Sequence, residues 1–182
     1  QGLPPNLYRL EALRVSVTAS RQGRIDDRQL ARLDLSLSET FIVHADHLRR
    51  GLLDPRQVTD HWHVPDRPSD LAGLLTTSLA FNDVAAALER LTPRRLAYAE
   101  LAGFLATAEG DELLRLEANL DRWRWLPRDL GDDYLLVRLA AFELDWIRGG
   151  VHQSSRRVIV GEAFRRTPSF ASQITDIVVY PS

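Results

Sequence analysis

The spacing of apolar residues changes near Gly131, and this change constrains the fold more than any other feature of the 182-residue chain. Before Gly131 apolar residues recur at helical spacing, whereas β-branched and alternating patterns dominate after it. The sequence therefore predicts an α+β fold, with an all-α helical module followed by the first strands of a mostly β domain. The expected parts are residues 1–110 for the helical module, 111–131 for a linking helix and 132–182 for the β part.

Helix start and stop signals divide the first part of the chain into several segments. Gly23 follows a first apolar stripe, and Asp26 or Asp27 can cap a second helix by accepting hydrogen bonds from free backbone N–H groups. Gly51 follows two arginines and is a typical end for that second helix. The other expected helices are one capped by Ser69, one capped by Asn82, one over residues 94–108 and one over residues 111–125.

Segments rich in β-branched and other apolar residues follow Gly131. The expected strands cover residues 134–139, 142–147, 157–161 and 174–180. Gly149-Gly150 predicts a hairpin turn, because both positions tolerate a positive φ. Four strands alone leave open sheet edges, so we expect further chain to belong to this β part.

The composition is typical of a globular protein and excludes several function classes. The formal net charge of −2 gives no electrostatic reason to expect nucleic acid or an anionic membrane as a partner. No apolar run approaches the roughly 18 residues that a membrane-spanning helix needs. The chain has no cysteine, which excludes disulfides, thiolate metal sites and thiol catalysis within these residues.

Two histidine groups could be drawn as metal ligands. His44 and His47 lie three residues apart on an expected helix with Asp46 between them, but no spacing supplies a further ligand. We therefore expect them to be solvated or packed helix residues. In the loop His61-Trp62-His63, we expect Trp62 to anchor the loop on the helical core and expect no metal at the histidines.

Other charged and aromatic groups also have structural explanations. Arg122-Trp123-Arg124-Trp125 could form a cation–π surface, but we expect a buried tryptophan face with the arginine stems packed beside it. Asp132-Asp133 is expected to enter a strand as a loop, and Glu143 with Asp145 to form the polar side of a strand. We expect neither pair to act in acid–base catalysis.

Three glycines and a Thr-Pro dipeptide in the second part of the chain fit turn geometry. Gly149, Gly150 and Gly161 follow no nucleotide-binding pattern. Thr167-Pro168 can shape the wall of an active site, because proline fixes φ and removes a hydrogen-bond donor, or it can be a simple turn. Both interpretations of this dipeptide remain open.

Several motifs carry a resemblance to a known family. Residues 119–127 read N-L-D-R-W-R-W-L-P, residues 60–65 read D-H-W-H-V-P after Asp54-Pro55, and residues 157–161 and 166–170 read R-V-I-V-G and R-T-P-S-F. In this combination the chain resembles the large periplasmic L,D-transpeptidases of bacteria. The resemblance implies a helical scaffold domain over residues 1–110, and the N-terminal part of a YkuD-type catalytic domain over residues 132–182.

The resemblance implies a role in peptidoglycan cross-linking and cell-wall remodelling in the periplasm or cell envelope. Such enzymes act on peptidoglycan stem peptides through a cysteine thiolate with a histidine beside it, need no metal or organic cofactor, and have cell-wall synthesis proteins as candidate partners. The cysteine and histidine motif is absent here, as is a peptidoglycan-binding module between Ala106 and Asp111. We therefore assign no catalytic, metal or cofactor-binding residue, leave substrate-binding residues unassigned, and expect an architectural role. The alternative is a non-catalytic cell-wall binding or protein-interaction module derived from that family.

Overall fold

The computed structural model describes residues 2–65, 68–128, 130–162, 164–176 and 179. The chain divides into two compact units, which we call the helical unit (residues 1–54 and 68–126) and the strand unit (residues 55–67 and 127–182). The α+β prediction is confirmed, because helices form the first part of the chain and small sheets follow. Residues 55–67, which the sequence placed within the helical module, group with the strands.

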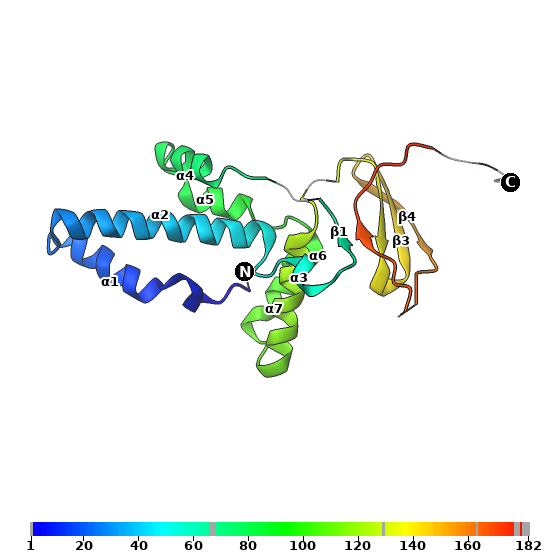
Figure 1. Cartoon of the computed structure of the whole chain (residues 1–182), viewed down its shortest axis with the longest axis horizontal. Helices are drawn as coiled ribbons and strands as arrows, with labels where there is room; N and C mark the ends of the chain where they lie inside the picture. The colour runs from blue at the N-terminus through cyan, green and yellow to red at the C-terminus, as the bar shows by residue number, and fades with distance from the viewer. Residues whose placement is uncertain (1, 66–67, 129, 163, 177–178, 180–182) are drawn as a thin grey trace. The chain divides into compact units, whose positions relative to one another are not determined.

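Six α-helices of seven residues or more, each labelled in Figure 1, make up most of the described part of the helical unit. The elements of this unit are η1 Pro5–Tyr8, α1 Leu10–Arg21, α2 Asp27–Arg50, α4 Leu71–Ala80, α5 Val84–Arg90, α6 Leu96–Gly103, η2 Phe104–Ala106 and α7 Gly110–Trp125. No described helix is long and apolar enough to cross a membrane.

Helix α2 begins and ends as its sequence predicts. The Asp26 side chain accepts a hydrogen bond from the Gln29 backbone N–H, and the Gln29 side chain accepts one from the Asp26 backbone N–H, which completes a capping box. Gly51 closes the helix with φ +89° and donates its N–H to the His47 carbonyl at 2.9 Å. Local hydrogen bonds thus define both ends of this 24-residue helix.

Two of the expected helix caps are wrong by one residue. Asp70 rather than Ser69 caps α4, where its carboxylate accepts the Gly73 N–H at 2.8 Å. Asp83 rather than Asn82 precedes α5, and Asn82 takes a left-handed conformation with φ +54°. Asparagine tolerates that conformation better than most residues, so Asn82 serves the turn after α4 and leaves the N-cap position to its neighbour.

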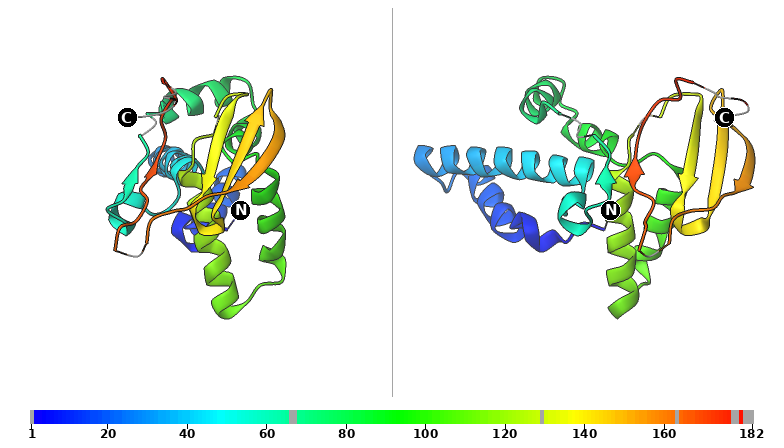
Figure 2. Two further views of the ribbon diagram at one scale, coloured as in Figure 1. Left: turned by 90° about the vertical axis from the view of Figure 1, so that its right-hand side faces the viewer. Right: turned by 45° about the vertical axis from the view of Figure 1, so that its right-hand side comes forward.

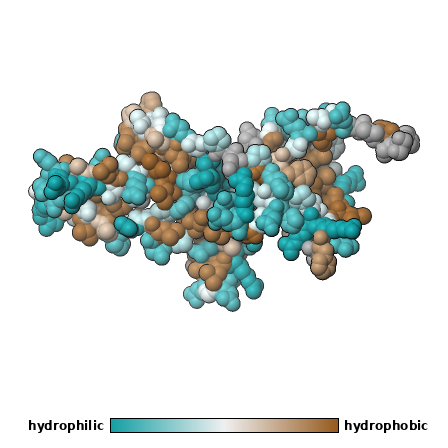
Figure 3. All heavy atoms as spheres, in the orientation of Figure 1, coloured by the Kyte–Doolittle hydropathy of each residue, from teal (hydrophilic) through white to brown (hydrophobic). Residues whose placement is uncertain are grey.

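A hydrophobic core joins α6 and α7. Its buried members are Tyr98, Ala108, Leu116 and Leu120, with Trp123 and several partly buried leucines packed against them. Apolar side chains also reach the surface of the helical unit over α4 and α1, whereas the tip between α1 and α2 is hydrophilic (Figure 3).

The strand unit contains one antiparallel and one parallel pairing. Its elements are α3 Pro55–Val58, β1 Trp62–His63, β2 Tyr134–Arg138, η3 Leu139–Ala141, β3 Glu143–Arg148, β4 Val151–Arg157 and β5 Ser169–Phe170. Strands β2, β3 and β4 form an antiparallel sheet in that order, and β1 pairs with β5 in parallel (Figure 2). The parallel pair therefore joins two segments that lie more than 100 residues apart in the sequence.

The β-hairpin turn is confirmed, but the last two expected strands are not found as predicted. Gly149 and Gly150 have φ +57° and +70°, as the tight turn between β3 and β4 requires. The strand after the turn is 151–157 instead of 157–161, because pairing with β3 holds a polar segment that has no apolar alternation of its own. Residues 174–176 lie outside any strand, and the rest of the expected strand 174–180 lies largely outside the described residues.

Candidate functional site

The most buried charged side chains of the helical unit lie on α7. Arg124 is completely buried and Asp121 is 5% exposed. The Arg124 Nη1 atom lies 3.2 Å from Asp121 Oδ1, and Arg124 Nη2 donates to the Tyr98 hydroxyl at 3.0 Å. Because a buried ion pair is stable only when further hydrogen bonds satisfy its charges, this polar group fixes α6 and α7 to each other in addition to their apolar contacts.

Asp121 also holds the turn that follows α2. One carboxylate oxygen accepts the Leu52 backbone N–H at 2.7 Å, and the other accepts the Leu53 N–H at 3.2 Å. A Cβ atom at Gly51 would lie 2.8 Å from Asp121 Oδ1 and 2.9 Å from Trp125 Nε1, closer than real Cβ contacts. A side chain at position 51 would therefore meet the carboxylate and the indole together. We call Gly51, Tyr98, Asp121 and Arg124 the polar core of the helical unit.

Sequence reasoning missed this polar core, although a signal for it exists. Leu116, Leu120 and Arg124 follow one another at intervals of four residues, which places all three on the same side of α7. Leu116 and Leu120 are buried in the core, so the next position on that side is buried as well. A charged residue at a core position of an amphipathic helix predicts a buried partner of opposite charge, and Asp121 lies three residues before it.

The two tryptophans of the signature lie in different surroundings. Trp123 packs against the apolar core of α6 and α7, whereas the Trp125 indole nitrogen approaches Gly51. Both side chains are half-buried, and Arg124 between them is more deeply buried than either. The structure therefore differs from the expected face of buried tryptophans with arginine stems packed beside it. The buried residue is Arg124, the tryptophans are half-buried, and Arg122 is exposed.

His44 and His47 both pack against Tyr8 of η1. The Tyr8 and His44 rings meet edge to face with centroids 4.7 Å apart, and the Tyr8 hydroxyl lies 3.0 Å from His47 Nδ1. Asp46, the remaining residue of the suggested metal set, forms ion pairs with Arg49 and Arg50. Within the part of the chain that the structure describes, no group of three or more histidine, cysteine or acidic residues could hold a metal ion.

Burial changes the protonation of this aromatic cluster. It lowers the pKa of His44, which the neighbouring His47 lowers further, and it lowers the pKa of His47 against the opposing charge of Asp46. Burial also raises the pKa of Tyr8. Around neutral pH the cluster therefore holds two neutral imidazoles and a neutral phenol.

This arrangement predicts that acid destabilises the helical unit. Between the ordinary histidine pKa of about 6.5 and the lowered values in the folded chain, the unfolded chain binds more protons, so stability falls as the pH falls through this range. We expect the midpoint of thermal unfolding, followed by circular dichroism at 222 nm, to decrease from pH 7 to pH 5. His44→Phe keeps a ring against Tyr8 but cannot bind a proton, and should weaken the pH dependence. His63→Phe, at an exposed position of the strand unit, is the matched control. An equal pH dependence in all three chains would contradict the assignment.

The strand unit brings two of the quoted sequence motifs together. Trp62 and His63 of D-H-W-H-V-P pair with Ser169 and Phe170 of R-T-P-S-F, and the Ser169 N–H donates to the His61 carbonyl at 2.8 Å. Trp62 belongs to β1 in the strand unit, and its role as an anchor of the loop on the helical core stays a prediction.

The second motif is also held by a turn of its own. The Thr167 hydroxyl accepts a hydrogen bond from the Gly161 backbone N–H at 2.7 Å. A Cβ atom at Gly161 would collide with the Arg165 carbonyl oxygen, so the close approach of two backbone segments requires glycine here. Thr167 therefore closes the loop from Gly161 and positions the residues that lead into β5.

One side of the antiparallel sheet carries a cluster of polar residues around Asp145. Its carboxylate accepts the Ser155 hydroxyl at 2.6 Å, and Arg138 pairs with both Asp145 at 2.9 Å and Glu143 at 2.6 Å. The hydrogen bond from Ser155, together with the Arg138 charge, lowers the pKa of Asp145. Glu143 and Asp145 thus share one guanidinium, and the Ser155 hydrogen bond and the Arg138 charge stabilise the ionised carboxylate of Asp145.

Ser155, His152 and Asp145 meet, but their geometry differs from that of a catalytic triad. His152 Nε2 lies 3.0 Å from Ser155 Oγ and 3.5 Å from Asp145 Oδ1, so the serine and the aspartate approach the same ring nitrogen. A triad needs its acid and its nucleophile on opposite nitrogens of the imidazole. The three residues form a hydrogen-bonded group that connects β3 and β4, and sequence reasoning missed Ser155 and His152 because they lie in an unrecognised strand.

The remaining acidic pair supports the hairpin. Asp133 accepts the Gly149 N–H through its carboxylate at 2.7 Å, and the Asp132 carbonyl accepts the Gly150 N–H at 2.8 Å. Asp132 and Asp133 therefore connect the start of β2 to the turn between β3 and β4.

Comparison with known proteins gives one match. The family model described as Scaffold domain matches residues 1–105, which is more than half of the chain and ends before α7. No curated protein and no solved structure matches the chain.

Proposed function

Because the chain belongs to the Scaffold domain family, the scaffold of L,D-transpeptidases, we propose that it is the structural part of an enzyme of peptidoglycan cross-linking. The observation that carries this proposal is the pairing of β1 with β5. Strand β1 lies within the matched residues 1–105, yet it pairs with Ser169–Phe170 of the strand unit. In this proposal, a segment of the scaffold family supplies part of the framework on which a catalytic domain is built.

The proposed reaction is an acyl transfer in the cell envelope. A thiolate attacks the carbonyl of the L,D bond in a peptidoglycan tetrapeptide stem, the terminal residue leaves as an amine, and the resulting thioester is transferred to an acceptor amine. These 182 residues contain no cysteine, so the thiolate comes from outside them. The helices and the paired strands have the architectural role, and cell-wall synthesis proteins are the proposed partners.

Muropeptide analysis tests this proposal. We expect deletion of the gene to remove the dimers that are cross-linked through L,D bonds from the muropeptides of the organism, as measured by liquid chromatography and mass spectrometry. Reintroduction of the intact gene should restore these dimers. An unchanged muropeptide profile in the deletion strain would contradict the proposal.

The 182-residue chain by itself should show no turnover of tetrapeptide stems, because a thioester cannot form without a thiol. Mass spectrometry of the intact chain after exposure to a carbapenem should likewise show no covalent adduct. Turnover or a stoichiometric adduct would reveal a nucleophile among these residues and refute the architectural assignment.

The second candidate function is a non-catalytic cell-wall binding or interaction module. It is favoured by the guanidinium that Glu143 and Asp145 share and by the approach of Ser155 and Asp145 to one ring nitrogen of His152, because this cluster connects strands of the sheet. Sedimentation of the chain with purified peptidoglycan sacculi would support this candidate if binding occurs while the deletion leaves the L,D cross-links unchanged.

A further inference from the structure

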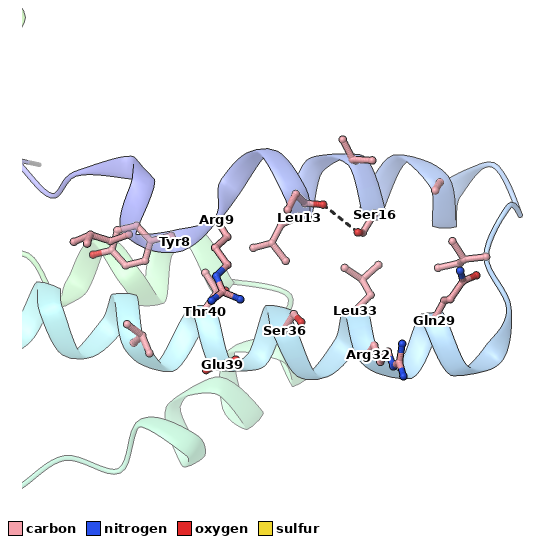
Figure 4. Close-up of a pocket in the computed structure, with 16 residues that line it drawn as sticks. Tyr8, Arg9, Leu13, Ser16, Gln29, Arg32, Leu33, Ser36, Glu39 and Thr40 are labelled. Atoms are coloured by element: carbon pink, nitrogen blue, oxygen red, sulfur yellow. Dashed lines mark hydrogen bonds between the residues drawn. The ribbon is translucent and has the colours of Figure 1, made fainter.

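A groove runs between α1 and α2 in the helical unit. Its volume is about 570 Å³, and Leu13 of α1 and Leu33 of α2 face each other across it (Figure 4). Helix α1 buries none of its residues, although it is a neighbour of α2 (Figure 4). The two helices therefore form a hairpin whose facing sides are incompletely packed.

Small side chains keep this groove open. On α1 the lining residues Ala12, Ser16 and Ala19 follow one another at helical spacing, and Ser36 lies on the opposing side of α2. At these positions short side chains do not fill the gap, so they leave space that side chains of a further helix can fill. Apolar residues at the edge of the groove remain exposed, with Val15 at 69% and Leu7 at 49%.

Two opposite charges lie on the side of α2 that lines the groove. Arg32 and Glu39 are seven residues apart, which is about 10 Å along a helix, and Ser36 lies between them (Figure 4). Both residues are exposed, and neither side chain has a hydrogen bond or ion pair with any residue that the structure describes. These two charges are therefore free to select a binding partner.

The two charges on α2 are complementary to the same two charges on an antiparallel second copy of the helix. When two copies of one helix pair antiparallel about a two-fold axis, a residue that precedes the axis in one copy meets a residue of the other copy that follows the axis by the same number of positions. An axis at Leu35–Ser36 places Arg32 of each copy opposite Glu39 of the other, so both ion pairs form at once. We propose that a second copy of this chain docks its α2 antiparallel against this groove, so that α1 and α2 of both copies form a four-helix bundle.

The bundle buries the surfaces that the single hairpin leaves open. In the dimer the exposed side chains of Leu7, Val15 and Val43 become buried away from water. This burial of apolar surface supplies the affinity of the two copies for each other. The Arg32 and Glu39 pairs select the antiparallel register, because a parallel pairing of the two helices would place like charges opposite each other. The chain has no cysteine, so a dimer formed in this way is noncovalent.

Charge reversal tests the dimer in the full 182-residue chain. Sedimentation velocity over a concentration series should show a reversible dimer for the original sequence. Arg32→Glu and Glu39→Arg should each weaken dimerisation by about tenfold or more, because each places two like-charged pairs in the interface. The double variant Arg32→Glu/Glu39→Arg restores opposite charges and should recover the dimer.

A matched control separates the interface from the overall charge. Arg14→Glu makes the same change of charge on the side of α1 that does not line the groove, and should leave the dissociation constant of the dimer unchanged. Circular dichroism of each variant establishes that the helices are retained. A chain that remains monomeric at its highest soluble concentration would overturn the proposal. So would a dimer that is insensitive to either reversal, or one that the double variant fails to restore.

Discussion

Replacing Asp121 with Ala should lower the free energy of unfolding of the helical unit by about 3–5 kcal/mol, as loss of one partner of a buried ion pair typically does. The variant leaves the completely buried Arg124 without the carboxylate at 3.2 Å. It also removes the acceptor of the Leu52 and Leu53 backbone N–H groups. Urea unfolding followed by circular dichroism at 222 nm measures the change.

Two further variants show whether the buried charge causes this loss. Asp34→Ala removes an exposed carboxylate from α2, and should change the free energy of unfolding by no more than about 0.5 kcal/mol. Asp121→Leu/Arg124→Met replaces both charges with apolar side chains, and should be more stable than Asp121→Ala because no uncompensated charge remains. A double variant as unstable as Asp121→Ala would show that the backbone hydrogen bonds, and not the charge, carry the effect.

Gly51→Ala should lower the free energy of unfolding by about 2–4 kcal/mol, because the strain of a positive φ and a steric conflict add together. The φ of Gly51 is +89°, and the added methyl group would lie 2.8 Å from Asp121 Oδ1 and 2.9 Å from Trp125 Nε1. To make room for the methyl group, the carboxylate must move away from the Leu52 N–H or the indole must shift. The same urea titration measures this change.

Gly110→Ala is the matched control for the steric part. Gly110 also has a positive φ, +55°, but nothing lies within 4 Å of the position that its Cβ would take. We expect Gly110→Ala to show only the cost of the left-handed backbone, about 1–2 kcal/mol. Equal effects at the two glycines would mean that the contacts around Gly51 relax without cost.

The helices could be predicted from the sequence because their signals are local. The capping box of Asp26 with Gln29 and the stop at Gly51 each depend on neighbours within one or two turns. The polar core could not be predicted in this way, because Asp121 meets Leu52 across 69 residues of sequence. Charge and periodicity show that Arg124 needs a buried partner, but they do not show that the same carboxylate closes the turn after α2.

The strands show the same limit more strongly. Strand β3 and the Gly149-Gly150 turn have clear patterns, whereas β4 is polar and is held in place by its partner. Strands β1 and β5 have only two residues each, too few to produce any periodicity. Their parallel pairing depends on tertiary structure alone. The contacts among Asp145, His152 and Ser155 depend on tertiary structure in the same way.

The interleaving of the chain affects how this protein can change during evolution. Residues 55–67 are encoded within the scaffold-family region but belong to the strand unit. A recombination event near position 127 would transfer β2 to β5 to a new gene without β1, the partner of β5. The strand unit therefore cannot be transferred as one continuous gene segment. A descendant protein keeps the pairing of β1 with β5 only when it inherits the strand unit together with the scaffold.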